Sequence, residues 1–211
     1  MSARTPAKDQ PKDFAFNKAN STLVKAILKK YPKGREQSAV IPLLDLAQRQ
    51  MGEETGTAGW VSIAAMNTIA DTLDIPYIRV YEVATFYTMF NLAPVGEHFV
   101  QVCRTTPCWL RGSDALTQSC LKKAGTSALG ETSKDGKFTV VEVECLGACV
   151  NAPMVQVNDD YYEDLDADSM EALMDKLAAG KKPPIGTQID RQNSAPHGEL
   201  TSLKKRAGKG K

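Results

Sequence analysis

The sequence predicts an α+β protein of two domains, in which a helical bundle precedes a small α/β domain and a basic extended tail follows. Hydrophobic residues recur with helical period over residues 14–93, and strand and helix patterns alternate over residues 94–180. Sustained periodicity ends at residue 181. The chain has 211 residues, of which 42% are hydrophobic and 24% charged, so disorder throughout is excluded.

The N-terminal part predicts a flexible arm and then helices. Residues 1–13 are polar and form the arm. The first helix is expected to begin after an N-cap at Asn20 or Ser21. The second helix is expected to end at Gly52, and the third is expected to open at Trp60. These helices and a fourth make up the predicted helical domain, residues 14–93.

The fourth helical segment, residues 77–90, reads YIRVYEVATFYTMF and is apolar nearly all round. A helix without a polar face is expected to be buried. Its aromatic side chains are therefore assigned to the core or to a subunit interface: Tyr81, Phe86, Tyr87 and Phe90.

The second domain, residues 94–180, predicts the element order β, α, β, β, α. The elements are a strand over 98–102, a helix over 112–125, a strand over 138–144, a hairpin over 154–165 and a closing helix over 168–179. The tail, residues 181–211, contains several prolines and glycines and is expected to be extended or disordered.

The charge distribution limits the possible partners. The net charge is +1, which argues against a nucleic-acid binder, although the charge is uneven. Residues 131–175 carry a net −10 and residues 181–211 a net +6. No apolar run approaches the roughly 20 residues that cross a bilayer, and the N-terminus lacks a secretory pattern, so we expect an intracellular protein without a membrane span.

Four of the five cysteines form two closely spaced pairs. Cys103 and Cys108 are separated by four residues, and Cys145 and Cys149 by three. Each pair begins where a predicted strand ends, so the four thiols converge if the two strands are neighbours in one sheet. Cys120 lies on the apolar stripe of a predicted helix, and we expect it to be a buried, unligated thiol.

Three interpretations of the four thiols remain open: a 2Fe-2S cluster, a structural zinc ion, and unligated or redox-active thiols. Unequal pairs suit a cluster in which each pair binds its own iron, and zinc loops more often use C-x2-C pairs. Apolar loop residues, which would shield a cluster from water, also favour the first interpretation: Pro107, Trp109, Leu146, Val150 and Pro153. The chain has no G-x-G-x-x-G motif or P-loop, so we expect it to bind neither NADH nor ATP through such a cradle.

Three motifs together resemble a known family. VCRTTPCWLRGS, ECLGACVNAPMVQVN and the upstream VYEVATFYTMF are similar to segments of the small 2Fe-2S subunits of NADH:quinone oxidoreductase, respiratory complex I, in the same order. The similarity runs over about residues 14–180. It implies that the second domain is a thioredoxin-like ferredoxin domain, in which Cys103 and Cys108 hold one iron of a 2Fe-2S cluster and Cys145 and Cys149 the other.

The resemblance also implies a function and partners. The chain would be an electron-transfer subunit that exchanges electrons with the FMN of a partner flavoprotein, which binds NADH, among other peripheral-arm subunits. The isolated chain would be inactive with NADH, and the complex would lie on the cytoplasmic side of a bacterial inner membrane, or the matrix side in mitochondria. Equivalent subunits of NAD-linked hydrogenases or formate dehydrogenases, and a zinc-stabilised interaction module, remain alternatives. The isomer of the bond before Pro153 also stays open.

Overall fold

The computed structural model describes residues 5–198 and residue 202, and the chain divides into two compact units. The first unit comprises Met1–His98 and Gly130–Thr139, and the second comprises Phe99–Leu129 and Val140–Lys211. The expected arm and basic tail therefore lie partly outside the described residues.

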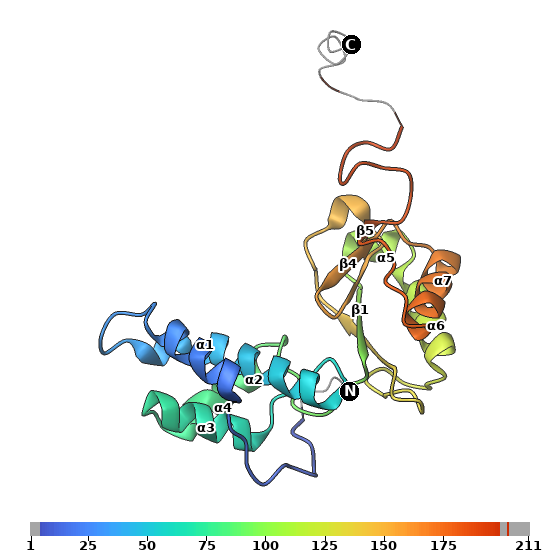
Figure 1. The fold of residues 1–211 in the computed structure, drawn as a ribbon. Helices are drawn as coiled ribbons and strands as arrows, with labels where there is room; N and C mark the ends of the chain where they lie inside the picture. Colours follow the sequence, from blue (N-terminus) through green and yellow to red (C-terminus); the bar gives the residue numbers. More distant parts are fainter. Residues whose placement is uncertain (1–4, 199–201, 203–211) are drawn as a thin grey trace. The chain divides into compact units, whose positions relative to one another are not determined.

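The described residues of the first unit form four α-helices and a short 3-10 helix (Figure 1). They are α1 (Lys18–Leu28), η1 (Glu36–Ala39), α2 (Val40–Thr55), α3 (Ile63–Leu73) and α4 (Tyr77–Phe86). Helix α2 contacts the other three α-helices, and its fully buried Leu43 and Leu44 lie in the hydrophobic core of the unit. The predicted helical order is therefore present in this part of the chain.

Helix α1 begins one turn earlier than the sequence predicts. Asn17 is the N-cap, because its side chain accepts a hydrogen bond from the backbone N–H of Asn20 at 2.9 Å. The expected N-cap at Asn20 or Ser21 is wrong. Asn20 lies inside the helix, where its amide donates to the buried side chain of Gln50 at 2.9 Å.

Helices α2 and α3 also differ at one end each. Helix α2 passes through Gly52 and ends at Gly56, which has φ +67° and is the C-cap. Gly52 does not end the helix. It allows the backbone of Thr57 to pack closely, since a Cβ at Gly52 would lie 2.8 Å from the carbonyl oxygen of Thr57. Helix α3 begins after Ser62, whose hydroxyl caps it, and not at Trp60.

The expectation that the fourth helix is buried all round is wrong. Only Val80 and Ala84 of α4 are buried, while Tyr77 is 62% and Phe86 75% exposed. The helix packs one stripe against α2 and α3, with Tyr81 and Val83 partly buried against the same core. Phe90, beyond the end of α4, does belong to the core. Assignment of the exposed aromatic residues to a subunit interface stays a prediction.

The second unit contains a mixed sheet in the order β2-β1-β3-β4-β5. The strands are β1 (His98–Cys103), β2 (Phe138–Val143), β3 (Val155–Val157), β4 (Asp160–Glu163) and β5 (Gly186–Thr187). Strand β3 pairs antiparallel with β1 and β4, and β5 pairs parallel with β4. The first four strands match the expected pattern, whereas the two-residue β5 carries too short a signal to be predicted.

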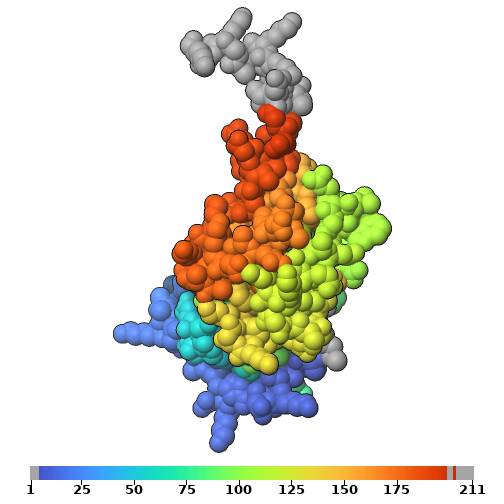
Figure 2. Space-filling model, turned by 90° about the vertical axis from the view of Figure 1, so that its right-hand side faces the viewer, coloured from blue at the N-terminus to red at the C-terminus, as the bar shows by residue number. Residues whose placement is uncertain are grey.

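The helical segments beside this sheet, within the part of the chain that the structure describes, are α5 (Thr106–Leu110), α6 (Ser113–Ala124), η2 (Cys149–Asn151) and α7 (Ala167–Ala178). Figure 1 shows α6 and α7 on the same side of the sheet, and Figure 2 shows them side by side on the surface, in yellow-green and orange. Ion pairs join them, with Lys122 Nζ 3.1 Å from Glu171. Cys120 on α6 is fully buried, as predicted.

None of the helices in the described part of the chain combines the length and the hydropathy that spanning a membrane requires.

Candidate functional site

The first thiol pair is carried by strand β1 and the short helix that follows it. Cys103 is the last residue of β1, and its backbone N–H donates to the carbonyl oxygen of Met154 at 3.3 Å. Helix α5 begins after the extended N-cap residue Thr105, with Pro107 in its first turn, where a missing N–H costs no helical hydrogen bond. This helix carries Cys108. Both cysteines are buried, with exposed fractions of 2% and 1%.

The second pair lies in the loop that follows β2. Cys145 comes after the strand, Gly147 turns the chain at φ +87°, and Cys149 is the first residue of η2. A positive φ is a conformation that favours glycine. The turn places the sulfur atoms of Cys145 and Cys149 3.5 Å apart, and both thiols are exposed.

The two pairs lie at the ends of neighbouring strands, because β1 and β2 are adjacent in the sheet, the condition that the sequence set for their convergence. At the end of these strands the backbone N–H of Arg104 donates to the carbonyl oxygen of Val143 at 3.2 Å. The thiols of Cys103 and Cys108 shift each other's pKa, and the charge of Cys103 also acts to raise the pKa of both exposed thiols. The four predicted residues are thus gathered as two pairs, and among residues 5–198 and 202 no three His, Cys, Asp or Glu side chains surround a single metal-ion position.

The pKa values of the two buried thiols are shifted in opposite directions. Burial raises the pKa of Cys103, but hydrogen bonds from the hydroxyl of Thr105 and from the backbone amide of Leu146 outweigh it, so that the pKa lies below its ordinary value. Burial and the hydrogen bond with Cys103 raise the pKa of Cys108 to about 12. Cys103 is therefore the member of this pair that more readily becomes a thiolate.

The pKa values of the two exposed thiols are also shifted in opposite directions. The backbone amide of Gly147 and a hydrogen bond from Cys149 lower the pKa of Cys145. The same hydrogen bond raises the pKa of Cys149. Each pair thus contains one thiol that surrounding donors stabilise as a thiolate, the form in which sulfur binds metals.

A small apolar cluster packs beside the first pair. Its buried members are Cys103, Cys108, Ala152 and Met154, with Leu146, Ala148 and Tyr161 packed against them. The Tyr161 hydroxyl donates to the carbonyl oxygen of Leu146 at 2.9 Å. The expectation that Trp109 and Val150 help to shield the thiols is not met in this chain, since they are 55% and 66% exposed. Neither residue belongs to the apolar cluster, in which Met154 is fully buried.

Sequence reasoning missed several residues that shape the site. Helix α5 is only five residues long, and the pattern Thr-Pro after Cys103 was its only signal. The bond between Ala152 and Pro153, which the sequence left open, is cis. The sequence did not predict the buried ion pair between Asp164 and Arg191, next to the Cys149 loop, because Arg191 was assigned to the tail.

Fold and site together define a class of protein. Four thiols at adjacent strand ends of a small mixed sheet, beside an apolar cluster, are a donor set suited to an iron–sulfur cluster rather than to an oxygen-ligand metal. The chain belongs to the thioredoxin-like [2Fe-2S] ferredoxin family, whose model matches residues 24–178. Membership confirms the family resemblance, the thioredoxin-like fold and the expectation of a 2Fe-2S cofactor.

Two relatives illustrate the similarity. The chain is 56% identical over 165 residues to an NADH-quinone oxidoreductase subunit of Rickettsia bellii, and the match covers 78% of this chain and 95% of the relative. It is 50% identical over 196 residues to the mitochondrial NADH dehydrogenase [ubiquinone] flavoprotein 2 of Dictyostelium discoideum, and this match covers 92% of this chain and 76% of the relative.

A solved structure shares the fold at lower sequence similarity. The crystal structure of an NAD+-reducing [NiFe]-hydrogenase in the H2-reduced state matches with a TM-score of 0.57 and 19% identity. The match covers 69% of this chain and 23% of the hydrogenase chain. At this identity the likeness concerns the fold alone.

Proposed function

We propose that the chain is the electron-transfer subunit of an NADH:quinone oxidoreductase and exchanges electrons with the flavin of a partner NADH-oxidising subunit. The observation that carries the proposal is the pairing of four thiols at adjacent strand ends, in a chain that belongs to a 2Fe-2S family. Relatives that are at least 50% identical bear the name of this enzyme. When bound, the cluster supplies one-electron chemistry.

The ligands in this proposal are the two pairs. Cys103 and Cys108 hold one iron, and Cys145 and Cys149 hold the other. The chemistry of the donors fits, because iron–sulfur clusters are held by thiolates and the sulfur atoms of Cys145 and Cys149 already lie 3.5 Å apart.

The chain's own groups tune the site. The amides of Leu146 and Gly147 and the hydroxyl of Thr105 stabilise negative charge on the sulfur atoms. Hydrogen bonds to the sulfurs raise the reduction potential of such sites. The apolar cluster around Met154 excludes water from the first pair, whereas the second pair is open to a partner.

The arrangement of the chain in this proposal is that of two domains with a tail. Residues 14–93 form a helical domain and residues 94–180 the 2Fe-2S domain, to which the segment that follows adds strand β5 and the buried Arg191. The two compact units support the division, although residues 130–139 cluster with the first unit.

The partners are the flavoprotein that holds FMN and NADH, and further subunits of the peripheral arm. The complex lies on the cytoplasmic side of a bacterial inner membrane, or on the matrix side in mitochondria. The names of the relatives, which denote subunits of an NADH-quinone oxidoreductase and of a mitochondrial NADH dehydrogenase, support assembly with further subunits.

The equivalent subunit of an NAD-linked hydrogenase is a second candidate, which the structural likeness to the NAD+-reducing hydrogenase supports at the level of fold. The test is purification of the untagged chain from its native host. Co-purification with a flavoprotein and quinone-reducing activity supports the respiratory enzyme, and co-purification with nickel and hydrogenase activity supports the alternative.

The cofactor and its ligands are tested on the chain itself. We expect a brown protein with two irons and two sulfides per chain, in line with its family. Serine at any of Cys103, Cys108, Cys145 or Cys149 should bleach the visible spectrum, because a hydroxyl is a harder and less acidic ligand. Cys120→Ser is the control and should keep the spectrum. A colourless protein with stoichiometric zinc would overturn the proposal in favour of an interaction module.

A further inference from the structure

The chain returns to the thiol site after α7. Strand β5 pairs with β4, and the backbone then brings Arg191 against Asp164, which directly follows β4. Arg191 Nη1 lies 2.8 Å from Asp164 Oδ1, and the two side chains are only 9% and 5% exposed. Because burying both charges removes them from water, such a pair persists only where further hydrogen bonds satisfy it.

Asp164 is the centre of these bonds. Its second carboxylate oxygen accepts hydrogen bonds from the Asn151 amide at 2.9 Å and from the Thr187 hydroxyl at 2.7 Å. Its backbone N–H donates to the carbonyl oxygen of Asn151 at 2.7 Å. Asp164 has φ +55°, an uncommon conformation for a residue other than glycine, and the surrounding bonds determine it.

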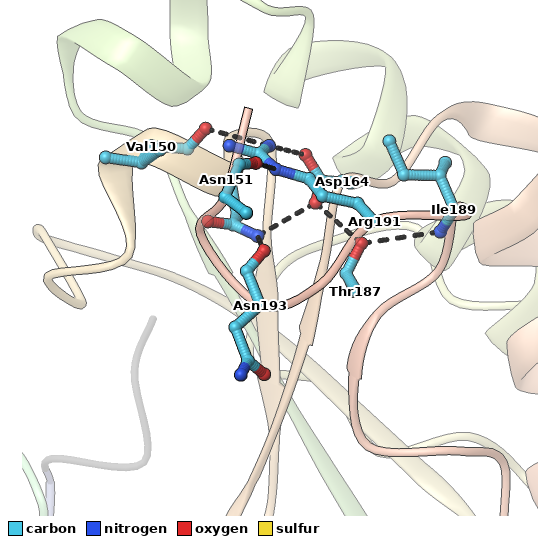
Figure 3. A network of polar contacts seen from close by, with 8 residues as sticks. Val150, Asn151, Asp164, Thr187, Ile189, Arg191 and Asn193 are labelled. Atoms are coloured by element: carbon cyan, nitrogen blue, oxygen red, sulfur yellow. Dashed lines mark hydrogen bonds and ion pairs between the residues drawn. The ribbon is translucent and has the colours of Figure 1, made fainter. Parts of the chain in front are cut away.

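The same network reaches the loop of the second thiol pair (Figure 3). Arg191 Nη1 also donates to the carbonyl oxygen of Val150 at 3.3 Å, and the Asn151 amide donates to the carbonyl oxygen of Asn193 at 2.9 Å. Val150 and Asn151 directly follow Cys149 in η2. The C-terminal segment thus holds the two residues next to a proposed ligand.

The loop is also held by its own backbone and by the apolar cluster: the N–H of Asn151 donates to the carbonyl oxygen of Ala148 at 3.0 Å, and Ala148 packs against the cluster. Cys149 is exposed and the side chain of Val150 points to solvent, whereas Asn151 is 1% exposed and lies within the network. The contacts with Asp164 and Arg191 therefore act on the two residues that directly follow Cys149, on the side of the loop where the thiol itself is exposed.

We propose that Arg191 is a positioning residue for Cys149. Through Asp164 and Asn151, the C-terminal segment latches the second thiol loop in the geometry that receives an iron. The inference rests on the proposed function, since Cys149 matters for the latch as a ligand. It assigns a role to a residue beyond the span matched by the family model, residues 24–178.

The test compares three variants of the full cluster-bearing chain. Arg191→Met removes the charge and all three hydrogen bonds of the guanidinium. Arg191→Lys keeps the charge, but a single ammonium cannot serve Asp164, Val150 and Ala195 in the same fixed geometry. The control is Arg49→Met, which removes an exposed Arg–Asp pair of similar length, 3.0 Å, in the other unit.

Cluster release to an iron chelator and the g values of the reduced cluster are the readouts. We expect Arg191→Met to release iron about 10-fold faster, as is typical when a group supporting a metal ligand is lost, and to shift the g values. Arg191→Lys should fall between this variant and the wild type, and Arg49→Met should match the wild type. Wild-type release and g values in Arg191→Met would overturn the latch, and Arg191→Lys decides the question if the Met variant does not fold.

Amide hydrogen exchange of the cluster-free chain separates the latch from the proposed function. The amides of Asn151 and Ala152 donate within η2, so they should exchange faster in Arg191→Met than in Arg49→Met. Equal exchange would overturn the latch whatever the cofactor is. A wild-type chain that binds no cluster would instead overturn the proposed function.

Discussion

The two thiol pairs of this chain are held in place by different means. Cys103 and Cys108 are buried, lie at the end of a strand and in a helix, and pack against Met154. Cys145 and Cys149 are exposed and lie in a loop that turns at Gly147. One pair therefore depends on the hydrophobic core, and the other on glycine conformation and polar contacts.

This difference has a functional consequence. A pair inside the core resists displacement, because moving it opens a cavity. A pair in a polar loop can face a partner, but each buried polar group that holds the loop must keep its own partners. Changes to the core should therefore affect the first pair through stability, and changes to the loop should affect the second pair through local geometry.

The largest effect is expected for Met154→Ala. Met154 is fully buried and contacts the first pair, so its truncation should lower the free energy of unfolding by about 2–5 kcal/mol and weaken cluster retention. Urea unfolding and the visible spectrum check both effects. Met170→Ala is the matched control, since Met170 is equally buried but lies on α7. Similar destabilisation with an unchanged spectrum is expected for Met170→Ala. Identical spectra in the two variants would contradict the role of the core in holding the first pair.

A smaller effect is expected for Gly147→Ala. A Cβ at Gly147 would meet no atom within 4 Å, so the cost arises only from the positive φ and should be about 1–2 kcal/mol. Because the turn places Cys145 and Cys149, the g values of the reduced cluster should shift as well.

Gly136→Ala is the matched control for this test. Gly136 has φ +74° and equally open space, so the loss of unfolding free energy should be similar. Gly136 lies outside the thiol loops, and the cluster signal should therefore remain that of the wild type. A shift of equal size in both variants would show that strain acts on the cluster only through global stability.

Tyr161→Phe should have a still smaller effect. It removes the hydroxyl that donates to the Leu146 carbonyl, a hydrogen bond expected to contribute about 1 kcal/mol. Since the Leu146 amide supports Cys103, a modest shift in reduction potential should accompany the loss. Protein-film voltammetry measures the potential, with Tyr77→Phe as the exposed control. An unchanged reduction potential would mean that the Tyr161 hydroxyl contributes to stability alone.

Local sequence patterns were enough to predict that the two thiol pairs follow the ends of strands, and these strands are neighbours in the sheet. The members of each pair are neighbours in sequence, and the hydrophobic patterns of β1 and β2 place both pairs at strand ends. Each of these signals spans only a few residues. The buried helix was a wrong prediction because apolar composition does not say which faces of α4 have a neighbour within the chain.

The Arg191–Asp164 pair could not be predicted from pattern. Its members lie on either side of α7, and their meeting depends on how the chain returns past β4. An arginine in a polar stretch is more often solvated than buried. The interpretation of the whole tail as one basic extension therefore missed that its first part supports the site.

The smallest effect is expected when the basic residues that follow the Arg191 network are removed. A variant ending at Gly186, the simplest way to remove the tail, would also remove Arg191 and confound charge with the latch. A variant that ends at His197 keeps Arg191 and the carbonyl oxygen of Ala195 to which it donates, while it loses five Lys and Arg residues and Glu199. It should fold and keep its cluster, because every proposed ligand precedes Val150.

Association of this variant with the flavoprotein should be weaker at low salt, because the lost charges can no longer attract an acidic surface. Exposed charge pairs contribute at most about 1 kcal/mol each, so the change in Kd should be a few-fold, and it should shrink beyond about 0.15 M ionic strength, where the Debye length is about 8 Å. A full-length chain with glutamine at the five basic positions separates charge from length: if charge is responsible, its affinity follows that of the shortened chain at every salt concentration. Equal affinity of the shortened and wild-type chains at low salt would mean that the segment after His197 adds nothing to docking, and that the contribution of the C-terminal region ends with Arg191.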